Sequence, residues 1–157
     1  MMTMLSNKQP MKYALYLGSA YKVQTEEDGN PRYYEDDDGN RIYHVTGEPK
    51  DFYGEPQEFD ANFSEAGGEA EAQEYGLSTA DYEGVIMYGK GAYPITIGAL
   101  IWKDSEVEYD SKTNYYTKDL HELIEVHSPS RKSADFVVMK TPDSLNFTRL
   151  ILEAINK

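Results

Sequence analysis

The sequence contains no cysteine, which excludes disulfide bonds, thiolate metal ligands and cysteine nucleophiles. Basic residues are scarce as well, because 15 Lys and Arg face 28 Asp and Glu and give a formal net charge of −13. A field of that sign repels a phosphate backbone, since nucleic-acid binding depends on cations that neutralise it. We therefore do not expect a protein that reads nucleic-acid sequence.

Long apolar runs are missing too. No window approaches the roughly 20 apolar residues of a membrane-spanning helix, and residues 1–11 lack the apolar core of a secretory signal. We expect no membrane partner, and a soluble protein of the cytoplasm unless it is packaged into a particle. The 157 residues fit one domain with extensions around one hydrophobic core.

Motifs for catalysis are also lacking. The stretch 121–125 resembles the start of a zinc-peptidase helix, but Glu125 stands where the second histidine is needed, and the chain has three histidines in all. The glycine-rich stretch 89–94 lacks the third glycine of a dinucleotide loop and the second half of a P-loop, and no Gly-x-Ser-x-Gly elbow occurs. The alternative of two carboxylates for glycoside hydrolysis stays open, because any acidic chain can supply such a pair. We predict no enzyme activity, no catalytic residue and no cofactor.

Acidic turns raise the question of a calcium loop. With Gly39 at the sixth loop position, Tyr34 and Val45 occupy the first and twelfth positions, where carboxylates are needed. With Gly29 at the sixth position, Gln24 is first and only Glu35 is correctly placed. We therefore predict solvated hairpin turns and no metal site.

Aromatic residues make up 13% of the chain, including 14 Tyr, and they suit pleated surfaces with one buried face. In 59–63, Phe59, Ala61 and Phe63 alternate with polar residues, as in a half-buried strand. Residues 84–88 and 93–97 predict a hairpin around the turn 89–91, 99–102 leads into another strand, and 134–139 with 147–155 predict a closing antiparallel pair. A terminal helix from 146 is the alternative. The predicted core comprises Phe59, Phe63, Ile95, Ile97, Ile101, Trp102, Phe136, Val138 and Leu150.

Two similar turns lie ten residues apart, at Asp28-Gly29-Asn30 and Asp38-Gly39-Asn40. Asp-Gly supplies the positive backbone angles of tight hairpins, so we predict a protruding β-ribbon over 21–45. Residues 46–56 contain two glycines and two prolines and predict a connector. The ribbon is predicted to present an acidic interface made of Glu26, Glu27, Asp28, Glu35, Asp36, Asp37 and Asp38.

The expected architecture is therefore mostly β: a small antiparallel β-barrel with an extended β-hairpin ribbon and a short helix or loop insertion. We divide the chain into a flexible N-terminal arm (1–11) and one barrel domain (12–157). That domain includes the ribbon with its connector (21–56) and an insertion (104–132) whose pattern fits a helix and a strand equally. Residues 12–23 predict a strand, or a short helix at their start. Residues 69–75 have helix-forming composition, enough for a turn or two.

Three segments in order, 58–76, 93–102 and 134–152, resemble the head-closure (stopper) proteins of long-tailed phages. The likeness rests on the Phe59-x-Ala61-x-Phe63 strand with its Ser-Gly-Gly-Glu-like loop, on the stretch 94–102, and on the strand 134–138 with the turn 144–146. It covers about a third of the chain and includes no residue that performs chemistry. The ribbon and the insertion lengthen this chain beyond the family's minimal barrel.

The resemblance implies a ring of six or twelve copies below the portal and adaptor, which closes the DNA channel and docks the tail. Its partners would be portal, adaptor and tail proteins and channel DNA bound without sequence preference, in the virion neck after assembly in the host cytoplasm. The family position of 64–75 implies a gate in the lumen. A tail-completion or terminator protein, or an acidic DNA-mimic inhibitor encoded by a phage, is the alternative. The residues assigned to the gate are Glu65, Gly67, Gly68, Glu69, Glu71 and Glu74.

Overall fold

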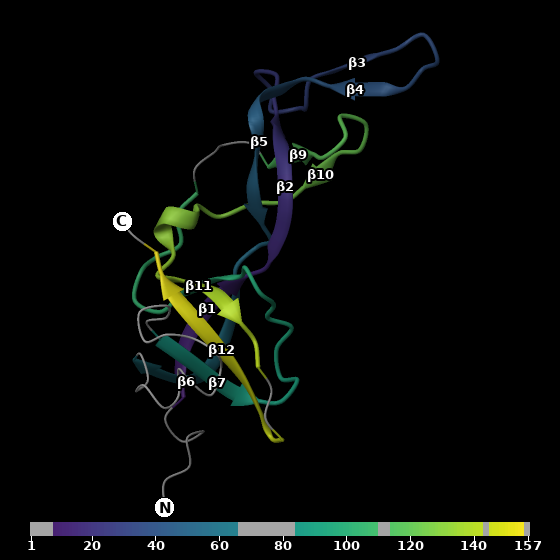
Figure 1. The fold of residues 1–157 in the computed structure, drawn as a ribbon. Coiled ribbons are helices and arrows are strands. Elements are labelled where there is room, and N and C mark those ends of the chain that lie inside the picture. The colour runs from purple at the N-terminus through teal and green to yellow at the C-terminus, as the bar shows by residue number, and fades with distance from the viewer. Residues whose placement is uncertain (1–7, 66–83, 110–113, 143–144, 156–157) are drawn as a thin grey trace, which may run out of the picture.

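The computed structural model describes residues 8–65, 84–109, 114–142 and 145–155. Strands supply nearly all of the regular structure in these ranges, and the 3-10 turn η2 (Arg131–Ser133) is short. The mostly β fold and the closed antiparallel barrel that the sequence predicts are confirmed. Figure 1 shows the barrel at one end and a long sheet projecting from it. Within the described ranges, no helix has the length and apolarity to cross a membrane.

Six antiparallel strands close the barrel in the order β1-β6-β7-β12-β11-β8. Closure gives each of the six strands two paired neighbours, so the barrel lacks the open edge strands of an open sheet. The bounds of these strands are β1 (Gln9–Ala14), β6 (Gln57–Glu65), β7 (Gly84–Gly89), β8 (Leu100–Trp102), β11 (Phe136–Lys140) and β12 (Phe147–Ala154).

The barrel interior is filled with side chains. Strand alternation turns Phe59 and Ala61 inward, and they are 3% and 0% exposed, while Asp60 between them is exposed. Tyr13 meets the ring of Phe59 edge-on at 5.4 Å between centroids, and Ile86 and Leu150 belong to the same cluster. A six-stranded barrel packed in this way has a core and no pore.

The segment between β7 and β8 packs on the barrel core without forming a strand. The predicted strand 93–97 is wrong, because β7 pairs with β6 and β12 and leaves no edge for it. Instead, Tyr93 and Ile95 turn their side chains onto the core, and Tyr93 meets Tyr88 edge-on at 5.1 Å. Ile97, predicted to be a core residue, is 60% exposed.

Trp102 faces a different cluster from the one predicted. Ile101 points into the barrel, so its neighbours Leu100 and Trp102 point outward, because adjacent strand residues face opposite sides. Trp102 packs outside the barrel against Tyr53, and its indole N–H donates to Ser133 Oγ at 3.0 Å. The other predicted core residues lie in or against the interior cluster, namely Phe59, Phe63, Ile95, Ile101, Phe136, Val138 and Leu150.

A second sheet, together with the hairpin at its far end, forms what we call the β-extension. Its four strands follow the order β10-β9-β2-β5, so the predicted insertion 104–132 contributes strands to this sheet in addition to η2. The predicted ribbon is present and begins earlier than expected, since β2 starts at Tyr16. The strands are β2 (Tyr16–Val23), β5 (Val45–Tyr53), β9 (Tyr115–Thr117) and β10 (Ile124–Glu125), with the hairpin β3 (Tyr33–Glu35) and β4 (Arg41–Tyr43).

The predicted connector 46–56 is wrong over most of its length, because Val45–Tyr53 is strand β5. Its glycine and proline fall where the pairing with β2 shifts: Ala20 faces Lys50, but Lys22 faces Thr46. Gly47 adopts a φ of +68° in this irregularity, and a proline there removes no ladder hydrogen bond. Breaker residues therefore mark a bulge inside one strand rather than a loop between two.

The boundaries at the two ends of the described chain also differ from expectation. Strand β1 begins at Gln9, which pairs with Ala61, and Met11 is 3% exposed, so residues 9–11 of the predicted arm belong to the barrel. The alternative of a terminal helix is wrong, because β12 pairs with both β7 and β11. The predicted helical turn at 69–75 lies outside the described residues.

Candidate functional site

Two turns of the same design carry most of the acidic residues of the β-extension. In the first, Gly29 N–H donates to Glu26 O at 2.9 Å, and in the second Gly39 N–H donates to Asp36 O at 3.0 Å. Both glycines have a positive φ, +89° and +83°, which L residues rarely adopt. The sequences EEDGN and DDDGN thus fold alike, and all their acidic side chains except Asp36 are exposed.

The second turn, residues 36–40, is the distal tip of the hairpin, and we call it the acidic tip. Asp36 Oδ1 accepts hydrogen bonds from the backbone N–H groups of Asp38 and Asn40, both at 2.9 Å. The bond from Asn40 is the largest cause that lowers the pKa of Asp36. Asp36 holds the turn, whereas Asp37 and Asp38 are exposed beside it.

A loop after β9 braces the hairpin against the rest of the β-extension. Tyr43 N–H donates to Leu120 O at 2.8 Å, and His121 Nδ1 lies 3.2 Å from Arg41 O. Asp119 Oδ1 accepts from the N–H groups of His121 and Glu122, and these bonds lower the pKa of Asp119. The hairpin is therefore held in one direction by a second segment of chain.

Aromatic side chains on the hairpin remain accessible. Tyr33 and Tyr34 are 41% and 50% exposed. The Arg41 guanidinium lies over the Tyr33 ring, 4.4 Å from its centroid, and covers one face of that ring. Exposed tyrosines beside carboxylates are suited to a protein interface, because they combine apolar area with a polar end.

A cleft with the opposite charge lies between β5, the end of β2 and η2. It measures about 180 Å³ and is lined by Lys22, Lys50 and Arg131 together with Tyr53. Burial raises the pKa of the Tyr53 hydroxyl, and the charge of Arg131 acts against that rise. We call these residues the cationic cleft.

Two features complete the wall of the cationic cleft. Ser128 also lines the cleft and fixes its base, because Ser128 Oγ accepts from Tyr53 N–H at 2.9 Å. Asp51 contributes one negative charge, but its Oδ1 already accepts from the hydroxyls of Tyr16 and Ser19 at 2.8 and 3.0 Å. The cleft therefore keeps an excess of positive charge in an acidic protein.

Two other clefts in the described part of the chain have no such excess. One of about 300 Å³ is lined by Lys12 and Lys103 but also by Glu58 and Asp60. Another of about 350 Å³ contains Lys12, Glu55 and Glu58. Neither selects a ligand of one sign.

Asp135 has a structural role. Its Oδ2 accepts from the backbone N–H groups of Lys103, Asp104 and Ser105 at 2.8–3.0 Å, and its Oδ1 accepts from Ser105 Oγ at 2.6 Å. Burial raises the pKa of Asp135, but these hydrogen bonds lower it by more, to about 2. The carboxylate ties the turn after β8 to the start of β11.

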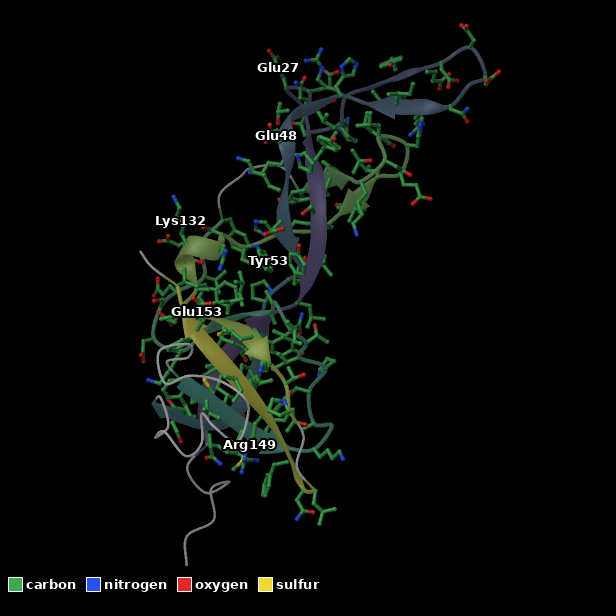
Figure 2. The ribbon with its side chains drawn as sticks, viewed as in Figure 1. Glu27, Glu48, Tyr53, Lys132, Arg149 and Glu153 are labelled. Carbon is green, nitrogen blue, oxygen red and sulfur yellow. The ribbon has the colours of Figure 1, made fainter. Side chains whose placement is uncertain are left out.

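The structure separates the acidic residues that the sequence grouped into one interface. Figure 2 shows Glu27 at the far end of β2 and β5, away from the acidic tip. In that first turn, Glu26 pairs with Arg32 at 3.5 Å. The predicted ribbon interface is therefore two acidic turns on different sides of the hairpin base. They comprise Glu26, Glu27 and Asp28 in one turn, and Glu35, Asp36, Asp37 and Asp38 at the other.

The predicted gate falls almost wholly outside the described residues. Glu65 is the last residue of β6. The rest of the gate, Gly67, Gly68, Glu69, Glu71 and Glu74, is not among the residues that the structure describes.

The described ranges contain no group of three or more His, Asp or Glu side chains arranged to hold a metal ion. Comparison with protein-family models, with curated proteins and with solved structures finds no match to this chain.

The cationic cleft has no signal in the sequence. Lys22 and Lys50 come from paired strands of the β-extension, and Arg131 comes from a turn about eighty residues further along the chain. The alternation of lysines with apolar residues in a strand is the same whether or not the lysines share a cleft, so the pattern does not predict one. Only the return of the chain from β10 to β11 brings Arg131 beside them.

Proposed function

We propose that this chain is a structural virion protein of the head–tail connector of a tailed phage. It forms a ring of six or twelve copies below the portal and adaptor, closes the DNA channel and docks the tail. One observation supports the proposal above the rest: a closed, packed barrel carries a long sheet whose braced hairpin ends in exposed tyrosines and carboxylates. An edge-free body with one projecting arm is suited to lateral assembly.

The packed interior of the barrel favours a DNA channel between copies in such a ring. Because Phe59, Ile86 and Leu150 fill the barrel, the channel runs between copies and not through any one of them. A net charge of −13 then favours passage, since an acidic wall repels the phosphate backbone and DNA slides without sticking.

A DNA-mimic inhibitor is the competing proposal, and the placement of charge favours the connector. A mimic spreads carboxylates along its surface at the spacing of phosphates. Here most acids of the β-extension gather in two turns, around Glu27 and around Asp37, with exposed aromatic residues between them, while others such as Glu48 and Glu122 lie singly. A free inhibitor gains nothing from that arrangement, whereas neighbouring subunits can pack on it.

The test is a nonsense mutation in the gene of the phage that encodes this chain. We expect heads that fill and then lose DNA, together with unattached tails, as seen by electron microscopy of the lysate. Supplying the protein from a plasmid should restore complete particles that contain it. Complete particles without the protein would refute the connector assignment, and inhibition of a nuclease by the purified protein would support the mimic instead.

A further inference from the structure

We propose that the acidic tip of one copy docks in the cationic cleft of the next copy. The inference deepens the proposed function by naming the contact between neighbouring subunits. It needs this chain alone, so it can fail while the connector assignment stands. Its basis is that one chain carries two complementary charged elements that cannot satisfy each other.

The charges on both elements are uncommitted. Among the described residues, no ion pair involves Lys22, Lys50 or Arg131. Within the same ranges, the side chains of Asp37 and Asp38 accept no hydrogen bond, because Asp36 alone holds the turn. Each element therefore presents free charge to a partner.

Geometry prevents the tip from reaching the cleft of its own chain. In Figure 1 the β3–β4 hairpin points away from the barrel on one side of the β-extension, and η2 lies on the other side. The bond from Tyr43 N–H to Leu120 O and the contact of His121 with Arg41 O fix that direction. A tip and a cleft on opposite sides make a head-to-tail contact between copies, which closes into a ring when the rotation allows it.

The cleft suits carboxylates in size and chemistry. Its volume of about 180 Å³ far exceeds the ~15 Å³ that one water needs, so it admits one or two short acidic side chains. Lysine and arginine donate charge-assisted hydrogen bonds to carboxylates. The braced tip loses little freedom on docking, which lowers the entropic cost of the contact.

A phosphate backbone is the other anion that such a cleft could bind, and two observations disfavour it. The net charge of −13 repels a polyanion before it reaches the cleft. Asp51 in the cleft wall repels both ligands. It repels a phosphate backbone, which carries charge along its whole length, more than it repels a short acidic turn.

Because the chain has no cysteine, engineered thiols report the contact directly. We would mix Asp37→Cys and Lys50→Cys proteins, each with a different mass tag, and measure disulfide-linked heterodimers under mild oxidation. The control mixture pairs Asp37→Cys with Glu106→Cys, an exposed position in the segment after β8. We expect the tip–cleft pair to cross-link about tenfold faster than the control, and the difference to shrink in high salt. Equal rates for the two mixtures would overturn the proposal.

Charge reversal supplies an independent arm with the full chain. Asp37→Lys/Asp38→Lys reverses the tip, and Lys50→Glu/Arg131→Glu reverses the cleft. Each double variant alone should weaken self-association in sedimentation experiments by about tenfold or more, whereas mixing the two should restore it, because each supplies the charge that the other lacks. Glu106→Lys/Glu153→Lys is the control with the charge change of the tip variant, and melting temperatures confirm that every variant is folded.

The outcomes separate the alternatives. Failure of the mixture to restore association in folded variants, or loss of association in the control, would overturn the proposal. Binding of labelled duplex DNA that is lost in the cleft variant, with self-association unchanged, would assign the cleft to phosphate instead. Restored association in the mixture would support the contact whatever the phage phenotype shows.

Discussion

Replacing Asp135 with Asn should destabilise the protein at neutral pH and leave its stability nearly unchanged in strong acid. In the folded protein, the Asp135 carboxylate accepts four hydrogen bonds, three from successive backbone N–H groups and one from the Ser105 hydroxyl. Asparagine keeps the shape but loses the charge and replaces one acceptor oxygen with a donor, which faces other donors.

The magnitude follows from the lowered pKa. A pKa of about 2 in place of the usual 3.8 corresponds to about 2 kcal/mol, at 1.36 kcal/mol for each pKa unit. The carboxylate is only partly buried, so solvent screening reduces this to about 1 kcal/mol. Misplaced donors in the Asn variant add to the loss, and we expect a total of about 1–2 kcal/mol at pH 7.

The sign of the pH dependence is fixed by the direction of the shift. Because the folded pKa of Asp135 is lower than the unfolded pKa, its stabilisation is complete above about pH 4 and is lost as the pH falls through about 2. Urea unfolding of the wild type and the variant from pH 7 to pH 2 should therefore converge at the acid end.

The matched control is Asp104→Asn, which removes the same charge from the same turn. Its side chain is largely exposed and pairs with Lys103 at the surface, so we expect a change of less than about 0.5 kcal/mol. If the free energies of unfolding of wild type and the Asp135 variant differ by the same amount from pH 7 to pH 2, the electrostatic reasoning is refuted. Equal stability at pH 7 would refute the structural role altogether.

Two further predictions concern the core and one backbone position. Phe59→Ala should lower the free energy of unfolding in urea by about 3–5 kcal/mol, because it opens a cavity in the barrel. Ile97→Ala, at a 60% exposed position, should lower it by less than about 1 kcal/mol. Similar losses for the two variants would place the core elsewhere. Gly98→Ala should lower the melting temperature, since Gly98 has a φ of +90° and a Cβ there would lie 3.1 Å from Tyr16; an unchanged melting temperature would show that the turn relaxes freely.

Local patterns in the sequence were sufficient for much of the fold. The alternation around Phe59 identified an inward face, because a strand repeats every two residues whatever its partners are. Gly29 and Gly39 identified two turns, since a positive φ is a property of single residues. The acidic residues of the hairpin followed from those turns. Each of these features depends on residues close together in the chain.

Strand partners and surface clusters required the tertiary structure. Residues 93–97 have strand composition, but β7 already has two partners, so the segment packs on the core without joining the sheet. Gly47 reads as a breaker, yet β2 accommodates it as a bulge within β5. Lys22 and Arg131 share a cleft because the chain returns past the sheet. Strand pairing and barrel closure are long-range choices, and the same local residue pattern is compatible with several of them until the whole chain has closed on its core.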